Sequence, residues 1–255
     1  MQGCGNDFVI VDGRVSDLSL TTQVIKRLSN RNFGVGCDQF IILKNAANAD
    51  VFMDIYNTDG SSAEACGNAT RCVANLMFEE KLADDASGNI SIETSAGVLK
   101  CRKVGDLFEV DMGEPKDTAT PLNFPELNLI GTPVNVGNPH CVFYCDDVAK
   151  IDLGVIGPLI ENDPRFPNKT NVEFVQICSR TNVIQRTWER GVGETLACGS
   201  GACAVAVAGV LRDFTDRQVT IELKGGTLAI EWRETDGHVL MSGPAEHVFT
   251  GEIRL

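Results

Sequence analysis

The sequence contains little of what several common classes of functional site require. It has three histidines and, among its ten cysteines, no Cys-x-x-C pair, which disfavours zinc sites of the usual spacing. No apolar run approaches the roughly 18 residues that a membrane span needs. Lysine and arginine number 22 against 35 acidic residues, a net charge of −13. We therefore expect neither nucleic acid nor an anionic membrane as the partner.

A secretory signal is also lacking, because the first residues show no basic segment followed by an apolar one. Ten cysteines in 255 residues are too sparse for a disulfide-stapled secreted domain. Most of them lie in apolar runs, where cysteine acts as a small core residue. A hydrophobic content of 43% indicates a globular protein, and we expect it to be soluble and cytoplasmic, with reduced thiols.

Two cysteines need a separate explanation, because each lies just before a predicted buried helix. Cys66 lies in "EACGNATRCVANLMF" and Cys198 in "LACGSGACAVAVAG", and a glycine follows each. The first N–H groups of a helix have no intrahelical partner, and the helix dipole favours an anion there. A helix start also lowers the pKa of a cysteine, so one of these thiols can be a thiolate near neutral pH.

The spacing of these cysteines reveals an internal duplication. Their sequence numbers differ by 198 − 66 = 132, and three polar pairs repeat at the same offset. These pairs are Asn6 with Asn138, Gln39 with Asn171, and Asn57 with Glu189. Further along, "MGEP" matches "MSGP" at an offset of 129. A period of this length indicates two homologous domains rather than a solenoid.

Each half contains short β-rich runs bounded by glycine, asparagine or aspartate, and one apolar helix. We predict an α/β, more narrowly α+β, fold of two homologous, pseudo-twofold-related domains. Each domain would be a curled, mostly antiparallel sheet around a central buried helix. The predicted domains are 1–115, completed by 245–255, and 116–244, with a junction near 118–128. Two further helices, at 21–30 and 151–161, are expected on the surface.

Two thiols at paired helix starts predict a proton-transfer reaction. Under pseudo-twofold symmetry both helix starts would open into one cleft. A thiolate could remove a proton from one face of a carbon, and a thiol could return one to the other face. This is racemisation or epimerisation by two bases, and it needs no cofactor. The amide groups that follow the thiols would stabilise charge on a substrate carboxylate, and glycine there allows close approach.

Several segments together carry a family resemblance along almost the whole chain. They are "GCGNDFVIVDG", "FGVGCDQ", "YNTDG", "ACGNATRC", "VGNPHCV", "TNVEF", "ERGVGETLACGSGAC" and "SGPAEHV". These motifs resemble the diaminopimelate epimerase family. The resemblance implies interconversion of LL- and meso-2,6-diaminopimelate on the route to lysine and peptidoglycan. It also implies a reaction without pyridoxal phosphate or metal.

The resemblance also implies a role for individual residues. Cys66 and Cys198 match the acid–base thiols, the first as donor and the second as acceptor for the LL substrate, with roles reversed in the other direction. The α-carboxylate and α-amino group would meet Gly67, Asn68, Gly199 and Ser200. The distal ammonium and carboxylate would be held by Asn6, Gln39, Asn57, Asn138, Asn171, Glu189 and Arg190. His140 and Glu189 match positions that adjust the pKa values of the thiols.

Two features depart from the family's pattern. Members usually have a short strand before the Gly-x-Gly-Asn-Asp-Phe motif, whereas this sequence begins at Met1-Gln2-Gly3, so we expect a sheet without its first strand. Phe249 stands where a tyrosine linked to dimerisation is common. We therefore predict a homodimer that buries the ring of Phe249 but lacks the hydrogen bond of a tyrosine hydroxyl.

Two other functions remain open from the residues alone. A proline or hydroxyproline racemase-like enzyme would use the same pair of cysteines but would need no clamp for a distal carboxylate, a role suited to Arg190. A thiol redox or binding protein would reversibly join Cys66 to Cys198. The lack of a Cys-x-x-C pair argues against redox chemistry as the primary role.

Overall fold

The computed structural model describes residues 1–15, 18, 20–80 and 88–253. The chain divides into two compact units, the first formed by Met1–Val110 with Gly243–Leu255 and the second by Asp111–Ser242. In the described part of the chain, no helix is both long enough and apolar enough to cross a membrane. The two units carry the same kind of sheet and buried helix.

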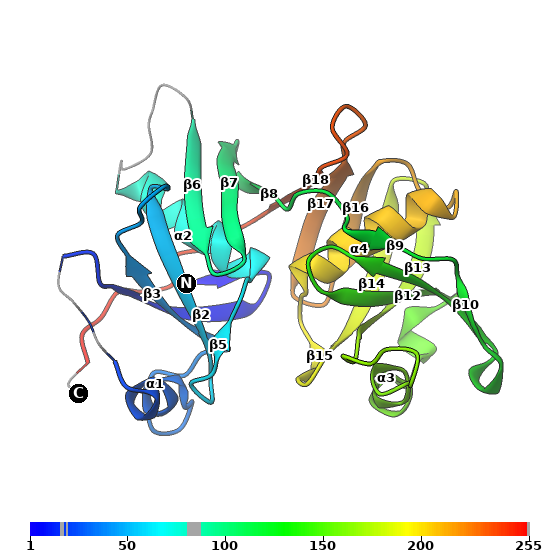
Figure 1. The fold of residues 1–255 in the computed structure, drawn as a ribbon, viewed down its shortest axis with the longest axis horizontal. Helices are drawn as coiled ribbons and strands as arrows, with labels where there is room; N and C mark the ends of the chain where they lie inside the picture. The colour runs from blue at the N-terminus through cyan, green and yellow to red at the C-terminus, as the bar shows by residue number, and fades with distance from the viewer. Residues whose placement is uncertain (16–17, 19, 81–87, 254–255) are drawn as a thin grey trace. The chain divides into compact units, whose positions relative to one another are not determined.

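The first unit is a mixed sheet with one buried and one surface helix (Figure 1). Its strands are β1 (Gln2–Gly3), β2 (Asn6–Asp12), β3 (Gln39–Lys44), β4 (Val51–Asn57), β5 (Ser62–Ala63), β6 (Asn89–Thr94), β7 (Gly97–Val104) and β8 (Leu107–Asp111), the last of which ends at the boundary. Its helices are α1 (Thr22–Ser29) and α2 (Gly67–Glu79). The sequence predicted a sheet without its first strand, but the two-residue strand β1 precedes β2 and pairs with it in antiparallel fashion.

The second unit repeats this plan with a longer meander at its start. Its strands are β9 (Asp117–Thr118), β10 (Leu122–Phe124), β11 (Leu129–Asn135), β12 (Pro139–Tyr144), β13 (Asn171–Ser179), β14 (Asn182–Glu189), β15 (Gly193–Thr195), β16 (Gln218–Leu223), β17 (Gly226–Trp232) and β18 (Val239–Gly243). Its helices are η1 (Pro125–Leu127), η2 (Val148–Lys150), α3 (Leu153–Glu161) and α4 (Gly199–Leu211).

The same sequence offset recurs in the strand register. Phe8 pairs with Gln39 between parallel strands β2 and β3, and His140 pairs with Asn171 between parallel strands β12 and β13. The helices α2 and α4 obey this offset over 13 residues each. Beyond them the offset of 129 holds, because the β4–β6 pair begins at Ile92 and the β14–β16 pair contains Ile221.

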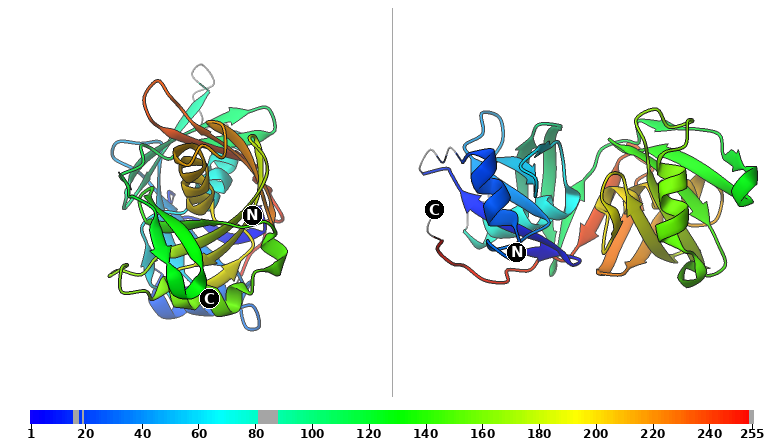
Figure 2. Two further views of the ribbon diagram at one scale, coloured as in Figure 1. Left: turned by 90° about the vertical axis from the view of Figure 1, so that its right-hand side faces the viewer. Right: turned by 90° about the horizontal axis from the view of Figure 1, so that it is seen from below.

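A buried helix lies against the concave side of each sheet. In α4 every residue from Gly201 to Gly209 is buried, which fits its run of alanine, valine and glycine, since small side chains let strands approach from several sides. The left view of Figure 2 shows α4 nearly end-on among the strands of its unit. The helix α3 instead packs outside the sheet, over Phe143 and Phe174. The predicted mostly antiparallel sheet around one buried helix is confirmed for each unit.

The strand β3 shows no alternation of apolar and polar residues, because its "FIIL" run is buried on both faces. One local expectation differs from the structure. The segment 118–128, expected as a junction, contributes β10 and η1 to the second unit, where β10 pairs with β11. Its polar residues and prolines belong to the meander edge rather than to a linker.

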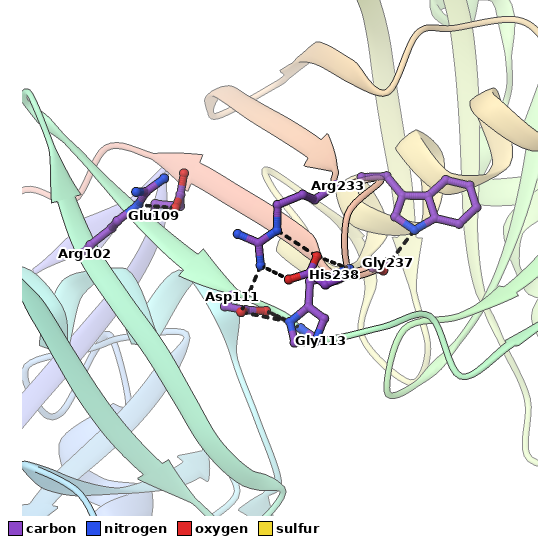
Figure 3. A network of polar contacts seen from close by, with 9 residues as sticks. Arg102, Glu109, Asp111, Gly113, Arg233, Gly237 and His238 are labelled. Atoms are coloured by element: carbon purple, nitrogen blue, oxygen red, sulfur yellow. Dashed lines mark hydrogen bonds and ion pairs between the residues drawn. The ribbon is translucent and has the colours of Figure 1, made fainter.

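A polar network stabilises the β17–β18 hairpin of the second unit (Figure 3). His238 directly precedes the strand β18, and its Nδ1 lies 2.7 and 2.9 Å from the two carboxylate oxygens of Asp111. Arg233 pairs with Asp236 across the hairpin turn, and the indole of Trp232 donates to the carbonyl of Gly237. These contacts fix the last hairpin of the second unit.

Candidate functional site

The first thiol lies at the start of α2. Cys66 is the N-cap residue, with an extended backbone (φ −150°, ψ 107°), and Gly67 and Asn68 form the first turn. The backbone carbonyl of Cys66 accepts hydrogen bonds from the N–H and the hydroxyl of Thr70, both at 2.9 Å. These bonds orient the peptide that precedes the helix. The thiol is partly exposed, whereas Asn68 is buried.

Asn6 of β2 joins this helix start. Its Oδ1 lies 3.9 Å from Cys66 Sγ and accepts a hydrogen bond from Asn68 Nδ2 at 3.2 Å. The amide orientation is fixed from the other side, because Nδ2 donates to Asp38 Oδ2 at 2.8 Å and a carboxylate only accepts. Asp38 is in turn held by Arg31 at 2.8 Å. Asn6 therefore presents an acceptor to the Cys66 thiol.

Gln39 and Asn57 form a second polar group in the first unit. They are directly paired residues on strands β3 and β4. Gln39 Nε2 donates to Asn57 Oδ1 at 3.2 Å, and Asn57 Nδ2 donates to the hydroxyl of Ser61 at 3.1 Å. Both side chains are half-buried. They offer amide donors and acceptors at the ends of their strands, as binding a small polar molecule would require.

The second thiol lies at the start of α4. Cys198 is the N-cap residue there, and its side chain is only 6% exposed. Its Sγ accepts a hydrogen bond from the N–H of Gly201 at 3.3 Å and lies 3.5 Å from the hydroxyl of Ser200. This is the side-chain capping pattern expected of a helix N-terminus, with sulfur in place of oxygen. Gly199 and Ser200 form the first turn.

A chain of polar side chains runs from Ser200 into the core. Asn138 Nδ2 donates to Ser200 Oγ at 3.3 Å, and Asn138 Oδ1 lies 2.9 Å from Nε2 of His140. On its other side, Nδ1 of His140 lies 2.7 Å from Oε1 of Glu173. The side chains of His140 and Glu173 are completely buried.

The remaining predicted residues lie where β14 ends. Glu189 accepts a hydrogen bond from the hydroxyl of Thr195 at 2.6 Å. The N–H of Arg190 donates to Asn171 Oδ1 at 2.9 Å, which ties this turn to the start of β13. The guanidinium of Arg190 is anchored by a 2.9 Å hydrogen bond to the carbonyl of Asn168. The turn is thus positioned from strand β13 and from the loop before it.

The environment of Cys198 differs from the one expected at a helix start. Burial, the largest effect, raises the pKa of this thiol well above its ordinary value, and the carboxylates of Glu189 and Glu173 raise it further. The hydrogen bonds from Ser200 and from the N–H of Gly201 act in the opposite direction. For Cys198, desolvation therefore outweighs the helix start, which alone would lower the pKa of the thiol.

The structure brings the predicted residues together in four groups within their own units. The groups are Asn6 with Cys66 and Asn68, Gln39 with Asn57, Asn138 with His140, Ser200 and Cys198, and Asn171 with Arg190. Asp38, Glu173 and Thr195 also contact predicted site residues and were not among the predictions. Of these, Glu173 had a signal in the sequence, because a glutamate interrupts the apolar "NVEFV" run.

Comparison with known proteins supplies the family. The model of the family described as diaminopimelate epimerase matches residues 1–118 and 132–248. The chain belongs to the diaminopimelate epimerase family. A diaminopimelate epimerase from Leptospira biflexa is 45% identical, covering 100% of this chain and 98% of that protein. One from Pelotomaculum thermopropionicum is 44% identical, covering 98% and 96%. As a diaminopimelate epimerase family member, the chain is an isomerase.

The fold of this diaminopimelate epimerase family member occurs more widely. A crystal structure of a hydroxyproline epimerase from Agrobacterium vitis matches with a TM-score of 0.68, covering 95% of this chain and 86% of that one. The two sequences are only 13% identical, so this likeness concerns the fold alone. The family and the fold predicted from the motifs are confirmed by these matches.

Proposed function

We propose that this protein interconverts LL- and meso-2,6-diaminopimelate, with Cys66 and Cys198 as an acid–base pair. The observation that carries the proposal is that each cysteine is the N-cap residue of a buried helix, beside side-chain amides or hydroxyls. Two relatives named diaminopimelate epimerase share 44–45% identity over nearly the whole chain. The product would serve lysine and peptidoglycan synthesis.

The chemistry follows from the two helix starts. The substrate α-carboxylate accepts hydrogen bonds from the first-turn amides that follow the two cysteines, those of Gly67, Asn68, Gly199 and Ser200. Charge that develops on the carboxylate as the α-proton leaves is stabilised by the same donors. One thiolate takes the proton and the other thiol supplies a proton to the opposite face. After one turnover the two cysteines have exchanged protonation states, with no net change in protons.

The distal end of the substrate needs partners for an ammonium and a second carboxylate. Arg190 is suited to the carboxylate, because a guanidinium can bind both oxygens at once. The carboxylate of Glu189 and the amides of Gln39 and Asn57 offer acceptors for the ammonium. The side chain of Asn171 accepts a hydrogen bond from the backbone N–H of Arg190 and so positions that residue. Asn6 contacts the Cys66 thiol, and Asn138 reaches Cys198 through Ser200.

Exchange of the α-proton provides the direct test. Reduced protein with LL-diaminopimelate in D₂O should lose the α-proton signal and form the meso isomer, as followed by proton NMR. The variants Cys66→Ser and Cys198→Ser should each lose the reaction. Cys178→Ser is the matched control, because Cys178 is an exposed thiol on β13 outside the site, and it should retain full activity. An active Cys66→Ser or Cys198→Ser variant would refute the mechanism.

The same assay separates the rival functions. Exchange with L-proline but not with diaminopimelate would keep the two-thiol mechanism and replace the substrate. Thiol–disulfide exchange activity without any α-proton exchange would indicate a redox protein. Absence of all three activities from reduced, folded protein would refute the proposal.

We also propose a cytoplasmic homodimer. None of the ten cysteines, all of which lie in the described part of the chain, is assigned to a disulfide, as is usual in a reducing compartment. The ring of Phe249 is 65% exposed within one chain, and Val248 and Ile253 beside it are exposed as well. Burial of this apolar segment against a second copy would remove it from water. Sedimentation velocity should show a dimer that Phe249→Asp dissociates, and a monomeric parent protein would contradict this proposal.

A further inference from the structure

The two thiol sites share their first layer but differ in the layer beneath. At the offset that relates the two cysteines, Asn138 corresponds to Asn6 and Ser200 to Asn68. The buried His140 and Glu173 of the second unit correspond to Phe8 and Ile41 of the first unit, which are also buried. A polar, titratable pair thus replaces an apolar pair beneath only one of the two thiols.

This replacement is not explained by stability. A buried carboxyl–imidazole pair is often no more stabilising than an apolar pair of similar size. In the described part of the chain, Oε2 of Glu173 has no hydrogen-bond partner, and leaving a buried acceptor unsatisfied is costly. Buried polar groups without a hydrogen-bond partner are typical of functional sites. The pair therefore calls for a functional explanation.

The hydrogen bonds around Asn138 allow two arrangements. In the first, Oδ1 of Asn138 accepts from Nε2 of His140, so the imidazole carries a proton there, and Nδ1 shares a second proton with Glu173. Nδ2 then donates to Ser200, whose own hydrogen can point to Cys198. With the N–H of Gly201, the sulfur receives two donors, as a thiolate requires.

In the second arrangement the amide of Asn138 is turned by half a rotation. Its Nδ2 donates to an unprotonated Nε2 of His140, and its Oδ1 accepts the hydrogen of the Ser200 hydroxyl. Ser200 Oγ then accepts the S–H hydrogen of Cys198. Passing from the first arrangement to the second moves one proton from the His140–Glu173 pair to the sulfur. The thiolate becomes a neutral thiol and the pair gains one negative charge, so protons and charge balance.

In the first unit the side-chain amide of Asn6 keeps one orientation, because its Nδ2 donates to the carboxylate of Asp38. We propose that Glu173 is a positioning residue that, through His140, Asn138 and Ser200, holds the proton that the Cys198 thiol gives up on becoming a thiolate, before that thiolate takes the α-proton of the substrate. This inference rests on the proposed two-thiol reaction. It explains how a thiol disfavoured as a thiolate by burial and by two carboxylates can still serve as a base, since in the first arrangement the thiolate accepts hydrogen bonds from Ser200 and from the N–H of Gly201.

Alkylation of the two cysteines measures this directly. The rate of reaction with iodoacetamide is followed from pH 6 to 10 by mass spectrometry of the Cys66 and Cys198 peptides. In Glu173→Gln the pair can no longer hold a proton on its carboxyl or pair an imidazolium with a carboxylate. We expect the pH midpoint for Cys198 to rise by about one unit, a tenfold loss of thiolate at a given pH. The midpoint for Cys66 should not move.

The direction of the shift separates positioning from simple charge. The titratable groups around the Glu173 carboxyl are His140, Cys141 and Cys198, and Glu189 lies near the sulfur. If Glu173 acted only by its negative charge, its removal would favour the thiolate and lower the Cys198 midpoint. A lowered or unchanged midpoint in Glu173→Gln would therefore overturn the inference.

Two further variants control for folding. Glu161→Gln makes the same chemical change at another buried glutamate of the second unit and should leave the Cys198 midpoint in place. The double variant His140→Phe with Glu173→Ile copies the apolar pair of the first unit. It should fold, as shown by circular dichroism, and raise the Cys198 midpoint like Glu173→Gln. A double variant that folds with the parental midpoint would overturn the inference.

The α-proton exchange assay, run beside alkylation, separates the two proposals. If the parent protein exchanges no α-proton, the two-thiol function fails, whatever the alkylation profile shows. If the parent protein is active and Glu173→Gln retains both its exchange rate and its Cys198 midpoint, only the role of Glu173 fails. If both proposals hold, Glu173→Gln should exchange the α-proton about tenfold more slowly than the parent protein at neutral pH, and its rate should approach that of the parent as the pH rises.

Discussion

Replacing Gly201 with alanine tests the close approach between α4 and the pair beneath it. A Cβ atom at this position would lie 2.8 Å from Oε1 of Glu173 and 3.1 Å from Nε2 of Gln185. The corresponding residue of the first unit is Ala69, and Ile41 and Met53 correspond to Glu173 and Gln185. Glycine is therefore needed in α4 because polar side chains lie where the first unit has apolar ones.

Two opposing terms set the magnitude. Alanine in place of glycine in a helix stabilises by roughly 0.5–1 kcal/mol. Overpacking a buried site costs about 1–3 kcal/mol, because the neighbours must move. Because the new Cβ would lie only 2.8 Å from Glu173 Oε1, the cost of overpacking should exceed the stabilisation of the helix. We therefore expect the free energy of unfolding to fall by about 1 kcal/mol. In a Glu173→Val background the clash with the carboxyl is removed, and the same change should become neutral or stabilising.

Urea unfolding followed by tryptophan fluorescence measures this change. Trp188 and Trp232 are the two tryptophans of the chain, and both belong to the second unit, so the signal reports on the unit that contains Gly201. The free energy of unfolding of Gly201→Ala is compared in the parent and in the Glu173→Val background. An equal effect in both backgrounds, or a Gly201→Ala variant more stable than the parent, would refute the reasoning.

Three further changes test the supports of the site. Burial raises the pKa of Glu161, but hydrogen bonds, including one from the indole of Trp188, together hold it below its ordinary value. The second unit should therefore lose stability as pH falls below about 4.3. The Glu161→Gln variant should show a smaller loss in tryptophan-monitored unfolding. Arg71→Met removes a buried donor to a backbone carbonyl of the C-terminal segment, which should cost about 1–3 kcal/mol and expose that segment to limited proteolysis, whereas parental resistance would contradict this role. Asp38→Asn frees Asn6 to turn its amide, so α-proton exchange through Cys66 should slow at unchanged thermal stability, and an unchanged rate would argue against this orientation.

The sequence by itself identified the two thiol motifs and their duplication. Cys66 and Cys198 could be recognised because a cysteine, a glycine and an apolar stretch form a local pattern, and the structure places both at helix N-caps. The offset between the two halves was also readable, because corresponding residues keep their spacing along the chain. The strand β3 carries no such local signal, since a run buried on both faces does not alternate between apolar and polar residues.

Only the tertiary structure decided how each thiol is surrounded. The helix start predicts a lowered pKa for Cys198, but burial and two carboxylates from strands β13 and β14 reverse the direction. Glu173 is distant from Cys198 in the sequence and reaches it through His140 and Asn138. Local motifs determine which groups cap a helix, because capping depends on neighbouring residues. Desolvation and charge depend on whatever other strands bring near the thiol, and these are known only once the sheet has closed around the helix.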